Sequence, residues 1–417
     1  MKAKKNKGDF KNMALSQQFY KNNRRRFAKQ LETNSGAILY SGRAISMSLD
    51  ATYPLYVNNN FYYLTGIQEE NVHLLITKDQ QGDVQEVLFI GQSDQNQEKW
   101  FGRQITPSQA QTISGIENID YNKNMKTVCQ QVQVLNVYYD YSTPKHQYSD
   151  AQKGDWLSGK VKKDLAGILT GMRLIKQKEE IEAIEKAVQI TQKGLAAILQ
   201  QMKPGMYEYE MAALFEYEVK RHGASGLSFP SIAVSGENGY ILHYIDNQAK
   251  LKAGDLILFD VGAKYQGYSG DISRTYPING VYQDEQAAIY EMVLNVQQKM
   301  IQQYRPGIKM QDLQAETEAL FYEGCHALNL DIPKDDIHQY YYHGLGHSLG
   351  LDTHDTNAQR DYKLEANMVI TCEPGIYMAD RGIGIRIEDD ILVTPRGGKV
   401  IHPGIPKTIQ AVEAAMK

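Results

Sequence analysis

Five acidic and histidine residues in the last third of the chain most constrain its fold, because they stand in sequence typical of buried strands. In chain order they are Asp260, Asp271, His347, Glu373 and Glu388. Asp260 lies in the apolar run LILFDVG, where an unpaired buried carboxylate would be very costly. Four carboxylates and one imidazole offer the oxygen and nitrogen ligands that divalent metal ions take. The five residues therefore predict a fold that gathers distant strands around a hydrolytic site with two metal ions.

The first two acids are predicted to lie side by side. Alternation along a strand puts Asp260 on the same face as Leu258, with Phe259 on the other face. A glycine-rich stretch, residues 262–270, then leads to Asp271. This spacing predicts a β-hairpin or a loop that returns the second carboxylate beside the first.

The same alternation argument applies to the later acids. Arg386 and Glu388 are two residues apart, so they share a strand face, whereas Cys372 points away from its neighbour Glu373 and is predicted to be core rather than a soft ligand. A single strand acid is more often one half of a salt bridge at a strand end. Five such residues in this order favour the metal site.

Two helix pairs indicate an internal repeat in the second half of the chain. Apolar residues at helical spacing predict a helix from Lys178 that stops at Pro204-Gly205, and a helix over about 284–304 that stops at Pro306-Gly307. A second helix follows each stop, over about 209–222 and from about residue 310. Aligning KPGMYEYEM with RPGIKMQDL gives a constant offset of 102 residues. Two helix–helix–strand units that face each other would leave a cleft for a substrate site between two half-sheets.

These motifs resemble the pita-bread metallopeptidases, which include methionine aminopeptidase, Xaa-Pro aminopeptidase (aminopeptidase P) and prolidase. HGLGHSLGLDTHD and MVITCEPGIY are most similar to the proline-specific branch, and NNNFYYLTGI resembles part of the N-terminal domain of aminopeptidase P. The resemblance covers nearly the whole chain from about residue 14. It implies an α/β (α+β) fold, in which an N-terminal mixed α/β domain precedes a pseudo-two-fold pita-bread catalytic domain.

The resemblance also implies how the five ligands divide between two divalent ions. Asp260 would bind one ion alone, Asp271 and Glu388 would bridge both, and His347 and Glu373 would bind the other. Mn²⁺ is the expected metal, with Co²⁺ and Zn²⁺ as alternatives. Four carboxylates nearly balance two such ions, and the site could hold a bridging hydroxide at neutral pH because bound metals lower the pKa of water.

The same resemblance implies roles for further residues. His243 and His354 would be catalytic together with Glu373, by shuttling protons or stabilising the tetrahedral intermediate. The expected substrate-binding residues are His243, His343, His354, Tyr377 and Arg386. His343 and His347 are four residues apart, which on a helix would make both of them metal ligands. Glycines at 344, 346 and 350 predict irregular backbone instead.

The length of the chain predicts two domains. A chain of 417 residues is too long for one typical core, so we expect an N-terminal aminopeptidase P-like domain over 14–170 and the metallopeptidase domain over 171–417. A helix over 16–32 and four strands are predicted in the first domain. The strands are expected at 37–40, 72–77, 87–90 and 134–139.

The basic N-terminus has two interpretations. Residues 1–26 carry a net charge of +8, and the whole chain carries −4, so the remainder carries −12. Such a segment could bind nucleic acid or a membrane, but residues 1–13 are better explained as a disordered, solvated tail, with Met13 as an alternative start. The acidic remainder gives no support for a nucleic-acid partner, and no apolar run is long enough to span a membrane.

The sequence therefore predicts a cytoplasmic Xaa-Pro aminopeptidase that releases the N-terminal residue of peptides with proline in second place. Three widely spaced cysteines and the lack of a signal-peptide pattern favour a reducing compartment. A prolidase limited to Xaa-Pro dipeptides is the alternative within the enzymes, and a non-catalytic peptide-binding relative is the alternative from another class. By resemblance alone, a homo-oligomer is expected, either a dimer or a tetramer.

Overall fold

The computed structural model describes residues 14–92, 94–141, 159–330, 332–356 and 362–417. The chain forms two compact units, Met1–Met172 and Arg173–Lys417. The basic tail predicted at residues 1–13 lies outside the described residues. Within the described ranges, no helix is both long and apolar enough to cross a membrane.

The N-terminal unit is built on one mixed sheet of six strands in the order β4-β3-β2-β1-β5-β6. The strands are β1 Ser35–Tyr40, β2 His73–Lys78, β3 Val84–Ile90, β4 Ile119–Tyr121, β5 Asn136–Tyr139 and β6 Val161–Asp164. The helices are α1 Gln17–Gln30, α2 Asn59–Thr65, α3 Gln95–Phe101, α4 Pro107–Ser114 and α5 Asn122–Gln131. The helix and the four strands predicted from the sequence all appear, displaced by no more than a few residues at their ends.

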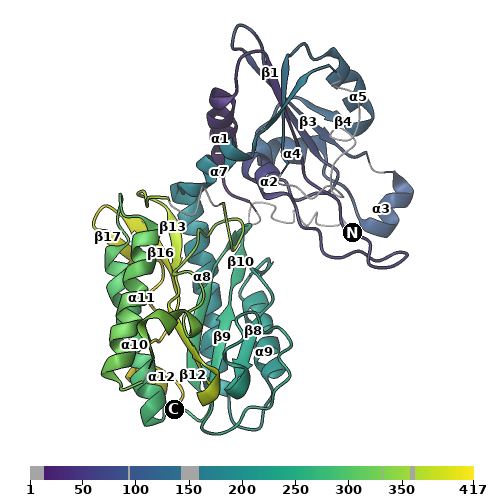
Figure 1. The fold of residues 1–417 in the computed structure, drawn as a ribbon. Helices are drawn as coiled ribbons and strands as arrows, with labels where there is room; N and C mark the ends of the chain where they lie inside the picture. Colours follow the sequence, from purple (N-terminus) through teal and green to yellow (C-terminus); the bar gives the residue numbers. More distant parts are fainter. Residues whose placement is uncertain (1–13, 93, 142–158, 331, 357–361) are drawn as a thin grey trace. The chain divides into compact units, whose positions relative to one another are not determined.

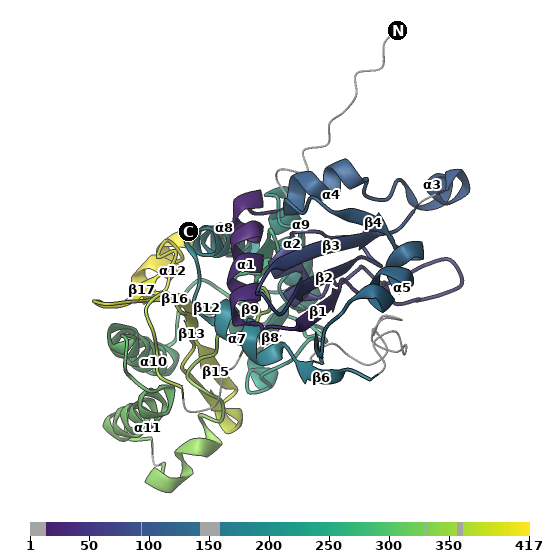
Figure 2. The same cartoon turned by 90° about the horizontal axis from the view of Figure 1, so that it is seen from above.

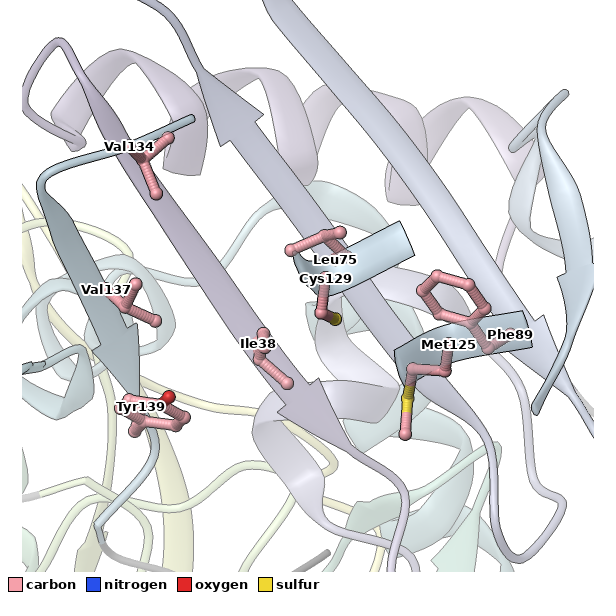
Figure 3. Close-up of a cluster of buried hydrophobic side chains, with 8 residues drawn as sticks. All are labelled: Ile38, Leu75, Phe89, Met125, Cys129, Val134, Val137 and Tyr139. Carbon is pink, nitrogen blue, oxygen red and sulfur yellow. The ribbon is translucent and has the colours of Figure 1, made fainter. Parts of the chain in front are cut away.

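One face of this sheet is covered by α5. Ile38, Leu75 and Phe89 project from three adjacent strands toward Met125 and Cys129 of the helix, and all five side chains are buried (Figure 3). β3 supplies Val87 and Phe89 and β5 supplies Val137 and Tyr139, so alternate residues of these strands face the cluster, as the pleat of a strand requires. Cys129 is thus a core residue, and burial raises the pKa of its thiol to about 11.

The second unit contains two helix pairs and several short sheets. Its helices are α8 Lys178–Gln201, α9 Glu208–Arg221, α10 Asp284–Gln303, α11 Met310–Ala327 and α12 Ile409–Ala415, and α7 Ala166–Leu174 leads into it. The strands of its first half are β7 Gly226–Leu227, β8 Ile232–Ser235, β9 Leu256–Val261, β10 Ala263–Tyr265, β11 Tyr268–Ser269 and β12 Ile272–Pro277. Those of its second half are β13 Val369–Cys372, β14 Gly375–Met378, β15 Ile383–Arg386, β16 Asp389–Thr394 and β17 Gly397–Val400.

The predicted internal repeat is present in this unit. Each helix pair packs beside its own strands: α9 contacts β7 and β8 and α8 contacts β10 and β11, whereas α10, which packs on α11, contacts β13 and β17 (Figures 1 and 2). Both Pro-Gly turns have the same geometry. Gly205 has φ 94° and Gly307 has φ 92°, a left-handed conformation that favours glycine. Each glycine N–H also donates to a leucine carbonyl, Leu251 for the first and Leu364 for the second.

The two central strands of the first half set the position of the acids. β9 pairs with β12 in antiparallel register, with Asp260 opposite Ser273. Asp271 stands one residue before β12, so the hairpin predicted from the glycine-rich stretch does return the second carboxylate beside the first. β10 and β11 form the short ladder at the tip of this excursion.

Phe89→Ala should destabilise the N-terminal unit, because it leaves a cavity in the cluster under α5. Phe89 is fully buried, and such a truncation costs about 3–5 kcal/mol. Val84→Ala on the same strand is the control, because Val84 is 42% exposed and should change stability by roughly 0.5 kcal/mol or less. Urea unfolding followed by circular dichroism measures both. Equal losses for the two variants would contradict the core assigned here.

Candidate metal centre

The structure brings the five predicted ligands together from five points of the catalytic unit. The imidazole Nε2 of His347 lies 3.5 Å from an Asp271 oxygen and 3.4 Å from a Glu373 oxygen. Ligand atoms of Asp271, His347 and Glu388 all lie within 4.8 Å of one another. Asp260 is close enough to act electrostatically on Asp271, Glu373 and Glu388.

Backbone contacts between the two halves of the repeat fix this arrangement. The Glu388 N–H donates to the carbonyl of Ser273 at 3.0 Å, and the Asp271 N–H donates to a carboxylate oxygen of Asp390 at 3.1 Å. The acids that precede β12 and β16 are therefore held against each other across the repeat.

His347 lies on an extended segment that runs beside β13. The Thr371 N–H donates to the carbonyl of His347 and the Glu373 N–H donates to the carbonyl of Leu345, each at 2.9 Å. A Cβ at Gly346 would stand 1.9 Å from the carbonyl oxygen of Thr371, so only glycine allows this close approach. The irregular backbone predicted from the glycines is confirmed, and the helical alternative that pairs His343 with His347 is wrong.

The cluster carries an excess of buried negative charge. Burial raises the pKa of Asp271 and Glu388 well above the usual range, and repulsion from neighbouring carboxylates raises both further. Burial also raises the pKa of Glu373, although His343 and Arg386 oppose that shift. Oδ1 of Asp260 is buried and has no hydrogen-bond partner among the residues that the structure describes. Such a set of oxygen donors fits divalent cations, which would supply the missing positive charge.

Arg386 organises one side of the cluster. Its guanidinium pairs with Asp260 at 2.6 Å, donates to the Ser273 hydroxyl at 2.8 Å and donates to the Tyr377 hydroxyl at 2.9 Å. Tyr377 lies 2.8 Å from Nε2 of His343. Arg386, Tyr377 and His343 therefore form one hydrogen-bonded chain that ends beside the acids.

The other two histidines lie at the rim. The rings of His347 and His354 meet edge to face with centroids 4.1 Å apart, and His354 is exposed. His243 is exposed, and its charge would act on both His343 and His354. Burial lowers the pKa of His343 and His347, and the partial covering of the His354 ring together with the neighbouring His347 lowers the pKa of His354, which favours neutral imidazoles at pH 7.

Three polar residues in this site were not predicted from the sequence. The Ser273 hydroxyl donates to Glu388 at 2.7 Å, and Asp390 accepts from the backbone of Asp271. The Thr371 hydroxyl accepts from the N–H of His347 at 3.0 Å and donates to Glu373 at 3.3 Å. Each of the three stands two positions from a ligand, so strand alternation, which did identify Arg386, could have found them.

Comparison with known proteins agrees with this geometry. Residues 182–395 match metallopeptidase family M24, and residues 20–138 match the aminopeptidase P N-terminal domain. The chain belongs to metallopeptidase family M24.

The similar proteins cover the chain almost from end to end. It is 32% identical to an Xaa-Pro aminopeptidase of Escherichia coli (strain K12), over 96% of this chain and 98% of the relative. It is 34% identical to an Xaa-Pro aminopeptidase of Haemophilus influenzae, again over 96% and 98%. The solved structure of aminopeptidase P from E. coli with the inhibitor Pro-Leu aligns with a TM-score of 0.89 at 31% identity, covering 97% of this chain and 98% of that one.

These matches confirm two predictions. The fold is the predicted α/β combination of an aminopeptidase P-like N-terminal domain and a pita-bread domain, and the protein is a metallo-aminopeptidase by family and by its relatives.

Glu388→Gln should stabilise the metal-free protein at neutral pH. A raised folded pKa means that the folded state keeps its proton longer than the unfolded state, so the contribution of Glu388 to stability is lost as pH rises through its folded pKa. The neutral amide avoids that loss, by about 1 kcal/mol or more for each unit by which the folded pKa is raised. The gain should be absent near pH 4 and should grow toward pH 7.

Thermal unfolding in chelator across that pH range measures this effect. Glu216→Gln on the exposed face of α9 is the matched control and should change nothing. Added Mn²⁺ should reverse the order, because the variant has lost a ligand for an ion that stabilises the folded parent. A variant less stable than the parent in chelator at pH 7 would show that Glu388 is not under electrostatic strain.

Proposed function

We propose that this protein removes the N-terminal residue from peptides whose second residue is proline, at a centre of two divalent metal ions. The observation that carries the proposal is the group of Asp271, His347 and Glu388, whose ligand atoms lie within 4.8 Å of one another, with Glu373 3.4 Å from His347. Asp260 adds a buried oxygen that has no hydrogen-bond partner among the described residues. The names of the similar full-length proteins support the substrate class.

The chain's residues fit the two ions. Asp260 would hold one ion, His347 and Glu373 the other, and Asp271 with Glu388 would bridge them. Four carboxylates nearly neutralise two divalent cations, and the oxygen-rich set suits Mn²⁺, with Co²⁺ or Zn²⁺ as alternatives. When bound, such ions lower the pKa of a shared water and polarise the peptide carbonyl, which supplies the hydrolytic chemistry.

Glu373 is the residue to which we assign proton transfer. Its carboxylate lies 3.4 Å from Nε2 of His347, beside the proposed ions, where it would take a proton from the attacking water and pass it to the departing amine. His354 and His243 would stabilise the developing oxyanion by donating hydrogen bonds to it. The hydrogen-bonded chain of Arg386, Tyr377 and His343 holds the opposite wall in place.

A partly buried apolar side chain next to His243 could contact a pyrrolidine ring. Tyr377, Ile232, Val234 and Leu258 form a buried core cluster, and Leu242 packs against it with its side chain only partly covered. Proline has no amide N–H and a fixed φ, so a site made for it needs no acceptor at that position. Leu242 is therefore the residue of this cluster that we expect to meet the proline ring.

We further propose a cytoplasmic, homo-oligomeric enzyme that acts on peptides rather than on nucleic acid or at a membrane. Cys129, Cys325 and Cys372 are all buried thiols without a disulfide, which suits a reducing compartment. The oligomer is inferred from the family resemblance.

Xaa-Pro-Xaa tripeptides should be cleaved far faster than matched Xaa-Ala-Xaa tripeptides. Alanine presents an unpaired N–H and a more flexible backbone, so the expected ratio of kcat/KM is on the order of 100 or more. Mass spectrometry should show a free amino acid and a peptide that begins with proline. Activity should vanish in a strong chelator and return with Mn²⁺.

Three results would redirect this assignment. Equal rates on the two tripeptides would indicate a general aminopeptidase. Cleavage of Xaa-Pro dipeptides but not of tripeptides would indicate the prolidase alternative. Full turnover in a verified metal-free preparation would exclude the metal mechanism.

His354→Ala should lower kcat without loss of metal. His354 contacts His347 through its ring only, and it is outside the group of ligand atoms around Asp271. A loss of at least ~10-fold in kcat is expected for a residue that steadies the transition state. Metal content by mass spectrometry should equal that of the parent, whereas loss of one ion per subunit would make His354 a ligand.

A further inference from the structure

A buried ion cluster lies directly behind His354. The next residue, Asp355, is 1% exposed at its side chain and contacts the guanidinium of Arg173. Its second oxygen accepts from Nζ of Lys176 at 3.1 Å, and the same ammonium donates to the Arg173 carbonyl at 2.7 Å. Arg173 and Lys176 are themselves almost completely buried, so water does not screen these pairs.

This cluster closes the loop that carries both histidines. The N–H of Asp355 donates to the carbonyl of Ser348 at 2.8 Å, and Arg173 also donates to Asp352 at 3.0 Å. A Cβ at Gly350 would stand 2.3 Å from the Asp355 carboxylate, so the loop folds tightly over the buried charge. Residues 347–355 thus form a closed turn whose two ends hold the touching rings of His347 and His354.

Asp355 is ionised in this setting. Burial alone would raise its pKa, but Arg173 and Lys176 outweigh burial and lower the pKa of the carboxyl group below its usual value. A buried charge of this kind is held to one geometry, because any displacement leaves it without its partners. The backbone of the adjacent residue is held with it.

We propose that Asp355, clamped by Arg173 and Lys176, is a positioning residue that fixes the His354 imidazole over His347 for the reaction. The inference rests on the proposed role of His354 in catalysis. Arg173 is the first residue of the catalytic unit and lies in α7, Ala166–Leu174. Both cations of this cluster, Arg173 and Lys176, therefore belong to the catalytic unit.

A second cluster of the same composition gives an internal comparison. Asp389 directly follows the ligand Glu388 and is buried between Arg274, at 2.6 Å, and Lys407, at 2.5 Å. Arg274 also donates to the carbonyl of Glu388. One Arg-Asp-Lys cluster thus stands behind a proposed metal ligand and the other behind a histidine that is no ligand. We therefore expect the Asp389 cluster to affect metal binding and the Asp355 cluster to affect turnover.

The test is a double-mutant cycle between Asp355→Asn and His354→Ala in the full-length, Mn²⁺-loaded enzyme on an Xaa-Pro-Xaa tripeptide. If Asp355 acts through His354, Asp355→Asn lowers kcat by about 10-fold in the parent, with KM and metal content little changed, and by less than ~2-fold when His354 is already alanine. Asp389→Asn should instead lower metal content. Folded protein is quantified by circular dichroism before each assay.

Two controls separate positioning from simple loss of stability. Leu199→Ala removes a buried side chain of α8 and should lower the melting temperature while leaving kcat unchanged. Arg173→Lys keeps the charge and should retain more turnover than Arg173→Met. Lys176→Met is a milder change than Asp355→Asn, because it leaves the Arg173–Asp355 pair intact. If the Asp355→Asn variant fails to fold, Lys176→Met takes its place in the cycle.

The outcomes are distinguishable. Additive losses in the cycle, or a parent-like kcat for the Asp355 variant, would overturn the positioning role alone. A fully active His354→Ala would instead overturn the catalytic role assigned to His354, on which this inference depends.

Discussion

The repulsion among four carboxylates that the fold forces into one buried site is the constraint on which the catalytic unit depends. Asp271 and Glu388 are nearly inaccessible to solvent, and each is held by a backbone contact that crosses the internal repeat. Such charges cost free energy unless cations accompany them. Arg386 supplies one positive charge, and the unpaired oxygen of Asp260 shows where more is needed. Without metal, this repulsion lowers the stability of the folded protein, and metal binding at the same place restores that stability.

The internal repeat explains how this site can be built at all. Each half brings a strand hairpin to the centre, and the acids lie just outside the strand ends, at Asp271 before β12 and at Glu388 before β16. Neither half alone could bury its acids beside a partner. The Pro-Gly turns at Gly205 and Gly307 repeat the same backbone geometry within the two helix pairs, whereas the strand ends of the two halves carry different residues.

Much of this could be predicted because it depends on local periodicity. Strand alternation placed Asp260 on β9, helical spacing placed α8 to α11, and the glycines around His347 ruled out a helix there. Glu388 was expected on one strand with Arg386, but it lies between β15, which ends at Arg386, and β16, which begins at Asp389. Alternation would also have reached Ser273, Thr371 and Asp390. Asp355 is different, because its partners Arg173 and Lys176 lie 182 and 179 residues away. No local pattern relates an aspartate in a loop to a cation at the start of the domain.

In the buried clusters around Asp355 and Asp389, neighbouring residues of the chain have different roles. In each case, a residue of the candidate metal centre or beside it is followed at once by an aspartate that is buried and paired with an Arg and a Lys. The inner aspartate needs its own Arg and Lys because the charge at the centre is already in excess. Several acids of this site have no counter-charge until metal binds. Such a site can be rigid only if ion pairs that do not depend on the metal hold the adjacent backbone in place. The interior pairs meet that requirement, and they explain why fixed cations lie behind the loop rather than among the ligands.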